Sequence, residues 1–201
     1  MAKVYTSATM SLDGYISGPG ESGFDRLFRW HESGDVPVPL FDWTMHLSEP
    51  SALHWRDMMA TTGAGVIGRR LFDLTDGWGG RTPGGHPCFV VTHSAPESWK
   101  DRETEVPFTF VTEGGVARAI ELAKAAADGK NVSVTGGNLA GQALNEGLLD
   151  EVWFDLVPVV LGDGVRLLDN LENTPVTLEG PITVIQGNGV THLRYRVIHS
   201  P

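Results

Sequence analysis

The arrangement of hydrophobic positions along the chain predicts two kinds of strand. Residues 3–10 alternate with a period of two, and one side of the predicted strand carries Val4, Thr6, Ala8 and Met10. Shorter apolar runs without alternation predict strands that are buried on both faces, as in parallel sheets. These runs cover residues 64–67, 89–92, 108–111 and 132–135.

Helical spacing separates several of these runs. Apolar residues recur at helical spacing over residues 51–62, 116–127 and 139–146, with Pro50 fitting a helix start. A long strand over residues 152–160 is interrupted by Pro158, and residues 177–185 and 190–198 form a predicted hairpin. This order predicts an α/β fold with a mainly parallel sheet and an antiparallel edge. Without repeats or linkers, we expect one domain over residues 1–201.

A segment from about residue 18 to 48 shows no clean period and is predicted to be a long loop. It is rich in Gly, Pro and aromatic residues, and long structured loops are often functional. Trp30 and Trp43 lie here, and Trp55 follows. They form either an aromatic wall against a flat substrate ring or the packing of the insertion. The histidines of this region lack metal-ligand spacing, so we expect no metal site.

Composition and charge exclude some function classes. The net charge is -10 without a basic block, which argues against nucleic-acid binding. No apolar run approaches the roughly 20 residues needed to span a bilayer, so no membrane partner is expected. The single cysteine, Cys88, lies in an apolar run and fits a buried strand thiol in a reducing cytoplasm.

Three short segments at predicted strand ends carry donors for an anion. Gly68, Arg69 and Arg70 follow one strand, and two guanidinium groups can bind phosphate oxygens, although exposed arginine pairs are common. Thr92, His93 and Ser94 follow a second strand and suit a ribose or its phosphate, or form a polar loop.

The third segment is Thr135 to Asn138, between a strand and a helix. Its glycines allow a close backbone approach to pyrophosphate, and the helix start offers free N–H groups. The alternative is a tight turn capped by Asn138. Because ligands bind at the carboxyl ends of parallel strands, the three segments together predict a dinucleotide site.

Several motifs, in order, resemble those of the dihydrofolate-reductase family, specifically the reductase domain of bacterial riboflavin biosynthesis and its stand-alone relatives. The resemblance extends from Lys3 to about Ile198. The motifs are Ser11 to Ile16, Gly68 to Phe72, Val91 to His93, Val134 to Leu139, Leu148 to Val152 and Val157 to Gly164.

This resemblance implies a three-layer fold with a central sheet of about eight strands, helices on both faces, and NADPH across the strand ends. It places Arg69 at the 2′-phosphate and Thr92, His93 and Ser94 near the adenosine. The residues implied at the pyrophosphate are Arg70, Leu71, Gly136, Gly137 and Asn138, with Leu139 and Gly68 beside them. It also implies a homodimer through the C-terminal strands.

The resemblance also locates the catalytic acid, and here the chain departs from the folate-reducing members. Their acidic helix position falls near Ala52, which cannot ionise. Glu49 is the closest acid before it and is one catalytic candidate. Asp13, after the first strand, is the other: it either orients substrate or donates a proton, or only forms a turn with Gly14.

These inferences lead to an NADPH-dependent reductase that transfers hydride to a small heteroaromatic, imine or carbonyl substrate. A narrower hypothesis is reduction of the ribosylamino-pyrimidine of the riboflavin pathway. The alternative from another class is a non-catalytic NADPH-binding module that regulates a partner.

Overall fold

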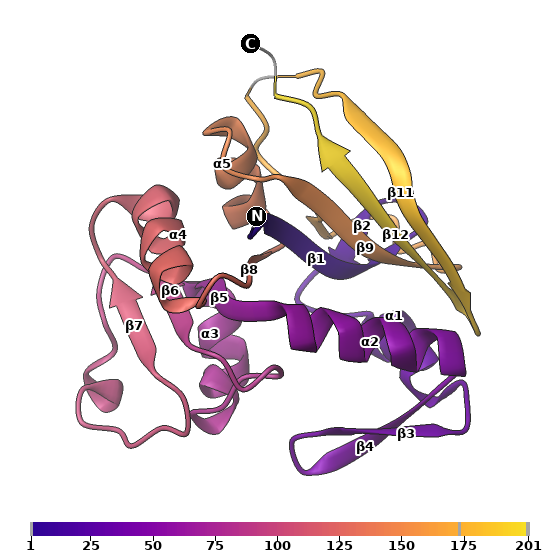
Figure 1. The fold of residues 1–201 in the computed structure, drawn as a ribbon, viewed down its shortest axis with the longest axis horizontal. Coiled ribbons are helices and arrows are strands. Elements are labelled where there is room, and N and C mark those ends of the chain that lie inside the picture. The colour runs from indigo at the N-terminus through magenta and orange to yellow at the C-terminus, as the bar shows by residue number, and fades with distance from the viewer. Residues whose placement is uncertain (1, 173, 200–201) are drawn as a thin grey trace.

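The computed structural model describes residues 2–172 and 174–199. Its largest element is an eight-stranded sheet in the order β11-β12-β9-β1-β8-β5-β6-β7 (Figure 1). The strands from β9 to β7 pair in parallel, and β12 and β11 add an antiparallel edge. Their bounds are β1 Val4–Ser11, β5 Thr62–Gly68, β6 Cys88–Val91, β7 Phe108–Val111, β8 Asn131–Thr135, β9 Glu151–Val157, β11 Leu178–Gly187 and β12 Val190–Val197.

Helices cover both faces of this sheet (Figure 1). On one face α4 and α5 pack with Val4, Val66 and Val134 in the largest apolar core. On the other face α2 packs Met58 against Tyr5 of β1, and α3 packs Phe72 with Ile67 of β5. The helices are α1 Phe24–Leu27, α2 Glu49–Thr61, α3 Arg69–Thr75, α4 Gly115–Ala126 and α5 Asn138–Asn145, with 3-10 turns η1 Phe28–Glu32, η2 Asp76–Gly79 and η3 Glu97–Trp99.

The alternation in the first strand is confirmed by this packing. Val4 is fully buried in the α4/α5 core, and Ala8 and Met10 pack against that core. Tyr5 points to the opposite face and stacks on Trp153 of β9, with ring centroids 3.7 Å apart. The predicted C-terminal hairpin is confirmed as β11 and β12, and Cys88 is buried, as expected. Burial raises the pKa of its thiol to about 12.

The prediction of a long loop over residues 18–48 is wrong. This segment contains α1, η1 and a two-stranded antiparallel sheet formed by β3 Val36–Leu40 and β4 Trp43–Leu47. It has its own apolar cluster, in which Leu27, Trp30, Met45 and Leu47 are buried. We call residues 18–48 the insertion. A further small sheet pairs β2 Tyr15–Ser17 with β10 Val165–Arg166.

The strand β9 ends at Val157, directly before Pro158, so the predicted strand was three residues too long. Proline has no N–H to donate to the parallel partner.

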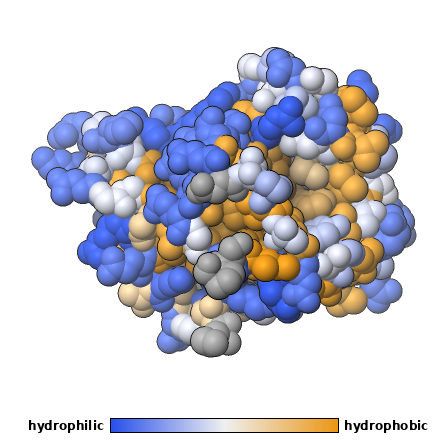
Figure 2. Space-filling view, turned by 90° about the horizontal axis from the view of Figure 1, so that it is seen from above, coloured by the Kyte–Doolittle hydropathy of each residue, from blue (hydrophilic) through white to orange (hydrophobic). Residues whose placement is uncertain are grey.

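At the sheet edge, β11 exposes Ile182 and Val184, and Figure 2 shows apolar patches among hydrophilic atoms on one face of the molecule. Dimerisation through the C-terminal strands stays a prediction. Among the described helices, none combines the length and apolar character that a bilayer crossing requires.

Candidate active site

A large cavity of about 1380 Å³ opens along the carboxyl ends of the parallel strands and extends beneath the insertion. Ligand pockets for one drug-sized molecule range up to about 1,000 Å³, so this cavity has room for more than one small ligand. We divide its lining into two parts. The strand-end half follows β5, β6 and β8, and the aromatic half is formed by Tyr5, Trp30, His31, Trp55 and Asp155.

All three predicted anion segments lie in the strand-end half of this one cavity. It is lined by Gly68, Arg69, Arg70, Leu71, Thr92, His93, Ser94, Gly136, Gly137, Asn138 and Leu139. The topology explains the convergence, because β5 lies between β6 and β8 and all three run in the same direction. Their carboxyl ends therefore meet at one edge of the sheet.

Arg69 is held in place by groups from two elements. Its Nε donates to both carboxylate oxygens of Asp73, at 2.7 and 2.9 Å, and its Nη1 donates to the Ser94 carbonyl at 2.9 Å. Nη1 also lies 3.3 Å from the Thr92 hydroxyl. Within the described part of the chain Nη2 has no hydrogen-bond partner, so the guanidinium at the cavity lining is fixed while one of its nitrogens remains available.

Arg70 has a different environment from its neighbour. Its side chain is 65% exposed, and its Nε donates to Glu21 of the insertion at 2.6 Å. This contact joins the insertion to the strand-end half. A surface ion pair of this kind contributes little stability and leaves the side chain free to exchange partners.

The turn Gly136-Gly137 brings backbone close to the cavity without a side chain. A Cβ on Gly136 would lie 3.0 Å from Ile16 and 3.1 Å from Leu167. Gly137 has φ +88 and ψ -148, a conformation that is essentially restricted to glycine. The alternative interpretation of a turn capped by Asn138 is wrong, because Gly137 is the N-cap residue and the Asn138 side chain instead accepts a hydrogen bond from Asn170.

The structure shows features of both interpretations of the tryptophans, namely packing of the insertion and an aromatic surface at a cavity. Trp30 is 3% exposed, packs in the apolar cluster of the insertion, and donates its indole N–H to Thr9 of β1 at 3.3 Å. Trp30, Trp43 and Trp55 nevertheless all line the cavity. Trp30 and Trp55 therefore pack in the insertion's cluster and present aromatic surface to the cavity at the same time, whereas Trp43 is 44% exposed and lies outside that cluster.

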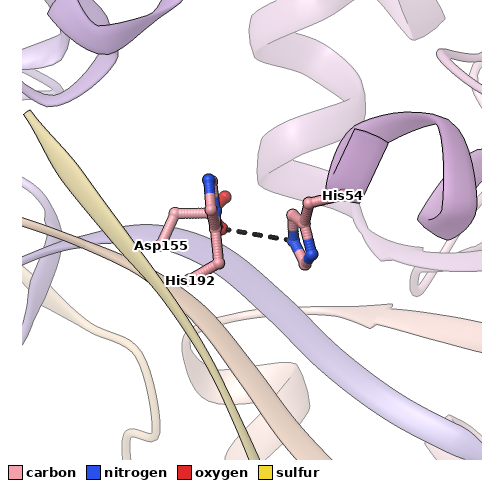
Figure 3. A group of neighbouring side chains, drawn as sticks. All are labelled: His54, Asp155 and His192. Carbon is pink, nitrogen blue, oxygen red and sulfur yellow. Dashed lines mark hydrogen bonds and ion pairs between the residues drawn. The ribbon is translucent and has the colours of Figure 1, made fainter. Parts of the chain in front are cut away.

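Asp155, His54 and His192 form a polar group that no sequence motif indicated. Their ligand atoms lie within 4.8 Å of one another (Figure 3). His192 Nδ1 lies 2.6 Å from Asp155 Oδ1, and His54 Nε2 lies 3.7 Å from the same oxygen. A signal was present in the sequence, since Asp155 interrupts the apolar run of β9 at a position on the Tyr5 side of the sheet.

Burial keeps the neighbouring histidines neutral at pH 7. Desolvation lowers the pKa of His54 to about 4 and that of His31 to about 4, against the opposing attraction of Asp155. Desolvation also raises the pKa of the Tyr5 hydroxyl to about 12, and this hydroxyl bonds Thr62 at 2.6 Å. The aromatic half therefore contains uncharged rings around one carboxylate.

Asp13 does not line the cavity, and its carboxylate has structural partners. It accepts hydrogen bonds from the Ser11 hydroxyl at 2.6 Å and from the backbone N–H groups of Leu161 and Gly162 at 3.1 and 2.7 Å. The Ser11 bond and these N–H groups hold its pKa at about 2. Gly14 has φ +91 and donates its N–H to the Ser11 carbonyl, so the structure supports the turn interpretation rather than a proton donor.

Glu49 is also placed away from the cavity. It lies in the first turn of α2 and lines a separate surface depression of about 550 Å³ with Pro50 and Leu53. Ala52 is fully buried in the cluster of the insertion. The position of Glu49 therefore gives no support to the predicted catalytic role.

The sequence matches the model of the RibD C-terminal domain over residues 2–189. Among curated proteins it is similar to the uncharacterised protein YwjB of Bacillus subtilis, with 36% identity over 95 residues. That alignment covers 46% of this chain and 51% of YwjB, so it spans about half the length of the relative.

Several solved structures share the fold. A putative riboflavin biosynthesis protein from Shewanella sp. PV-4 is 21% identical, with a TM-score of 0.65 over 98% of this chain and 99% of that one. A pyrimidine reductase-like protein from Corynebacterium diphtheriae is 15% identical, with a TM-score of 0.61 over 99% and 93%. The riboflavin biosynthesis reductase Rib7 of Saccharomyces cerevisiae is 12% identical, with a TM-score of 0.62 over 98% and 90%.

These likenesses confirm the three-layer dihydrofolate-reductase-like fold that the sequence motifs implied. The match to the family model is independent of them and covers nearly every residue from the first strand to the loop of the final hairpin. This chain belongs to the RibD C-terminal domain family.

Proposed function

We propose that this chain is an NADPH-dependent reductase that transfers hydride to a small heteroaromatic, imine or carbonyl substrate. The observation that supports it most directly is the convergence of the three strand-end segments on one cavity that also has an aromatic half. A dinucleotide needs donors spread over several strand ends, and a reductase needs a second site beside it.

The residues present fit this cofactor. The Gly136-Gly137 turn lines the cavity without side chains, and the N–H groups that begin α5 have no partner within the helix. Arg69 and the Thr92–Ser94 segment form a donor cluster at the end of β6 that suits the 2′-phosphate. When bound, NADPH supplies the hydride, and the aromatic residues exclude water from its acceptor.

The relatives support the class of reaction. One solved neighbour is described as pyrimidine reductase-like and another as a riboflavin biosynthesis reductase. A heterocyclic substrate is therefore the first class to assay. The non-catalytic alternative is less well supported, because a module that only binds the nucleotide has no need of the aromatic half.

The decisive experiment compares cofactors on Arg69→Ala. Losing a charge-assisted contact to the 2′-phosphate costs on the order of 2 kcal/mol, so NADPH affinity should fall roughly 30-fold while NADH affinity changes little. Fluorescence titration measures both. Arg118→Ala on α4, where the guanidinium pairs with Glu121, is the control and should bind both cofactors as the unaltered protein does.

Catalysis is tested by NADPH oxidation, followed optically, with pterins, pyrimidines, quinones and carbonyl compounds. Oxidation with any of these supports the reductase. Tight NADPH binding without oxidation by any compound of the panel supports the regulatory module instead. An equal loss of affinity for NADPH and NADH in Arg69→Ala would show that Arg69 does not contact the 2′-phosphate.

A further inference from the structure

Asp155 combines a fixed position with a free oxygen. Its Oδ1 accepts from His192, whereas its Oδ2 has no hydrogen-bond partner among residues 2–172 and 174–199. The side chain is 16% exposed and lines the aromatic half of the cavity. Within the described residues this oxygen is not among the buried side-chain atoms that lack a partner, so it is accessible from the cavity, where a ligand donor can replace water.

A chain of hydrogen bonds fixes the group that holds this carboxylate. The backbone N–H of Asn188 donates to Ser48, the Ser48 hydroxyl donates to Ser51, and Ser51 Oγ lies 2.9 Å from His192 Nε2. Because a carboxylate can only accept, His192 Nδ1 must carry the proton that it shares with Asp155. The Ser51 hydroxyl, which already accepts from Ser48, then donates to His192 Nε2.

Every member of this chain donates in the same direction, toward Asp155. The arrangement places a proton on Nδ1 of His192, whose side chain is completely buried. His192 pairs directly with Asp155 across the β12–β9 ladder, so the sheet register sets their approach. Asp155 is the last acceptor of the chain, and its remaining oxygen lies at the cavity.

The guanidinium of Arg194, which lies beside His54, is already engaged by other groups. Arg194 donates to Asp57 at 3.1 Å, lies 3.4 Å from His54 Nδ1, and stacks its guanidinium 3.8 Å from the Trp153 ring centroid. His31 and His54 remain uncharged at neutral pH because of their burial. Among residues 2–172 and 174–199, no lysine or arginine therefore pairs with the Asp155 carboxylate.

A metal ion is a poor occupant for this group. The His54 and His192 rings stack with centroids 4.2 Å apart and planes 24° from parallel, so their nitrogen lone pairs do not converge. The short Nδ1–Oδ1 contact holds a proton between His192 and Asp155, and Arg194 adds a positive charge beside His54. Figure 3 shows this arrangement, with His54 approaching from α2 and the other two side chains from the sheet.

We propose that Asp155 is the substrate-recognition carboxylate of this site and accepts N–H groups from the edge of a planar heterocycle lying against the aromatic half. Ser51 and His192 are positioning residues that orient it. The inference rests on the proposed reductase function and extends it, since it names the substrate class as rings with an N–H donor edge. The acid comes from β9, rather than from the helix position occupied here by Ala52.

Two small probes of equal shape test the proposal. 2,4-Diaminopyrimidine carries N–H donors, and 2,4-dimethylpyrimidine replaces them by methyl groups. We expect the diamino compound to bind the unaltered protein, measured by calorimetry, ~10- to 100-fold more tightly than the dimethyl compound, as charge-assisted hydrogen bonds require. Equal affinity for the two, or no binding of either at millimolar concentration, would overturn the proposal.

The variant Asp155→Asn removes the charge and keeps the shape. It should lose the preference for the diamino compound while its NADPH affinity stays within about twofold, whereas Asp101→Asn in an exposed turn should change neither. An unchanged preference in Asp155→Asn overturns the inference alone. If the unaltered protein does not bind NADPH, the proposed reductase function is refuted. A preference for the diamino over the dimethyl compound that depends on Asp155 would still support this recognition site in that case.

Nitrogen-detected NMR of the unaltered protein keeps the test valid if Asp155→Asn fails to fold. His192 should show a neutral imidazole with the proton on Nδ1, and only the diamino probe should shift that Nδ1–H signal. Ser51→Ala, which removes the donor to Nε2, should weaken the diamino probe several-fold and broaden this signal. A proton on Nε2 instead, or no shift with the probe, would contradict the proposed orientation.

Discussion

The two halves of the cavity are assembled in different ways. The strand-end half uses short continuous segments, such as Thr92–Ser94 and Gly136–Leu139, each placed directly after a strand. The aromatic half uses side chains from β1, η1, α2 and β9, and these four elements lie far apart along the chain. Asp155, for example, is 37 residues from His192 and meets it only through strand pairing.

This difference explains what each half responds to. The strand-end half depends on backbone conformation and on a few fixed donors, so its binding properties are local. The aromatic half depends on how the insertion and α2 pack over one face of the sheet, where Met45, Leu47 and Trp30 are buried together. A change in the packing of the insertion should therefore affect ligand binding mainly in the aromatic half. A change in backbone conformation at a strand end should affect binding mainly in the strand-end half.

The largest separation of the two halves is expected from Met45→Ala. Met45 is fully buried in the cluster of the insertion, and truncation of a buried Met costs about 2–5 kcal/mol of unfolding free energy. Chemical denaturation should show this loss, and calorimetry should show weaker binding of 2,4-diaminopyrimidine. NADPH affinity should stay within about twofold. Equal weakening of both ligands would show that the halves are not independent.

Much of the fold was accessible from the sequence because its elements are strongly patterned. The alternating first strand, the buried parallel strands and the final hairpin all follow from local periodicity. The insertion was missed because its strand β3 contains Pro37 and Pro39, which normally argue against a strand. A two-stranded sheet tolerates them, since each strand has an outer edge that needs no donors.

The site was predictable to the extent that its residues are contiguous. All eleven residues predicted for the cofactor line the cavity, and so do the three tryptophans. The two predicted acids lie outside the cavity lining, which the sequence could not show because position along the chain does not reveal a carboxylate's partners. Asp13 bonds backbone N–H groups 148 and 149 residues away, and Glu49 points to another surface. Asp155 could be identified only from the pairing of β9 with β1 and β12, because that pairing places it on the Tyr5 face of the sheet beside His192.

Gly137→Ala should have a smaller effect than Met45→Ala and the opposite selectivity, because it should weaken NADPH binding and spare the pyrimidine. A side chain at φ +88 and ψ -148 introduces about 1–3 kcal/mol of backbone strain in the strand-end half. NADPH affinity should fall roughly tenfold if the turn shifts to relieve that strain, while binding of 2,4-diaminopyrimidine is retained. Gly129→Ala is a suitable control, because Gly129 also has a positive φ of 75 but lies in a turn outside the cavity. Loss of NADPH affinity in both variants would trace the effect to general destabilisation.

The smallest effect is expected from Asp13→Asn, which should leave both halves intact. The folded-state pKa of Asp13 is about 2, below its ordinary 3.8, because the ionised carboxylate accepts from Ser11 and from two backbone N–H groups. Its contribution to stability is therefore complete above about pH 3.8 and is lost as the pH falls from there through about 2. Asp13→Asn should lower the melting temperature slightly at pH 7 and remove this acid-dependent step from melting curves recorded between pH 5 and 2. NADPH and 2,4-diaminopyrimidine should both bind as before, since the carboxylate only ties the turn after β1 to the segment after β9. A selective loss of 2,4-diaminopyrimidine affinity would instead indicate that Asp13 contacts the substrate. Asp155 would then share with Asp13 the role of candidate acceptor for the N–H groups of the ring.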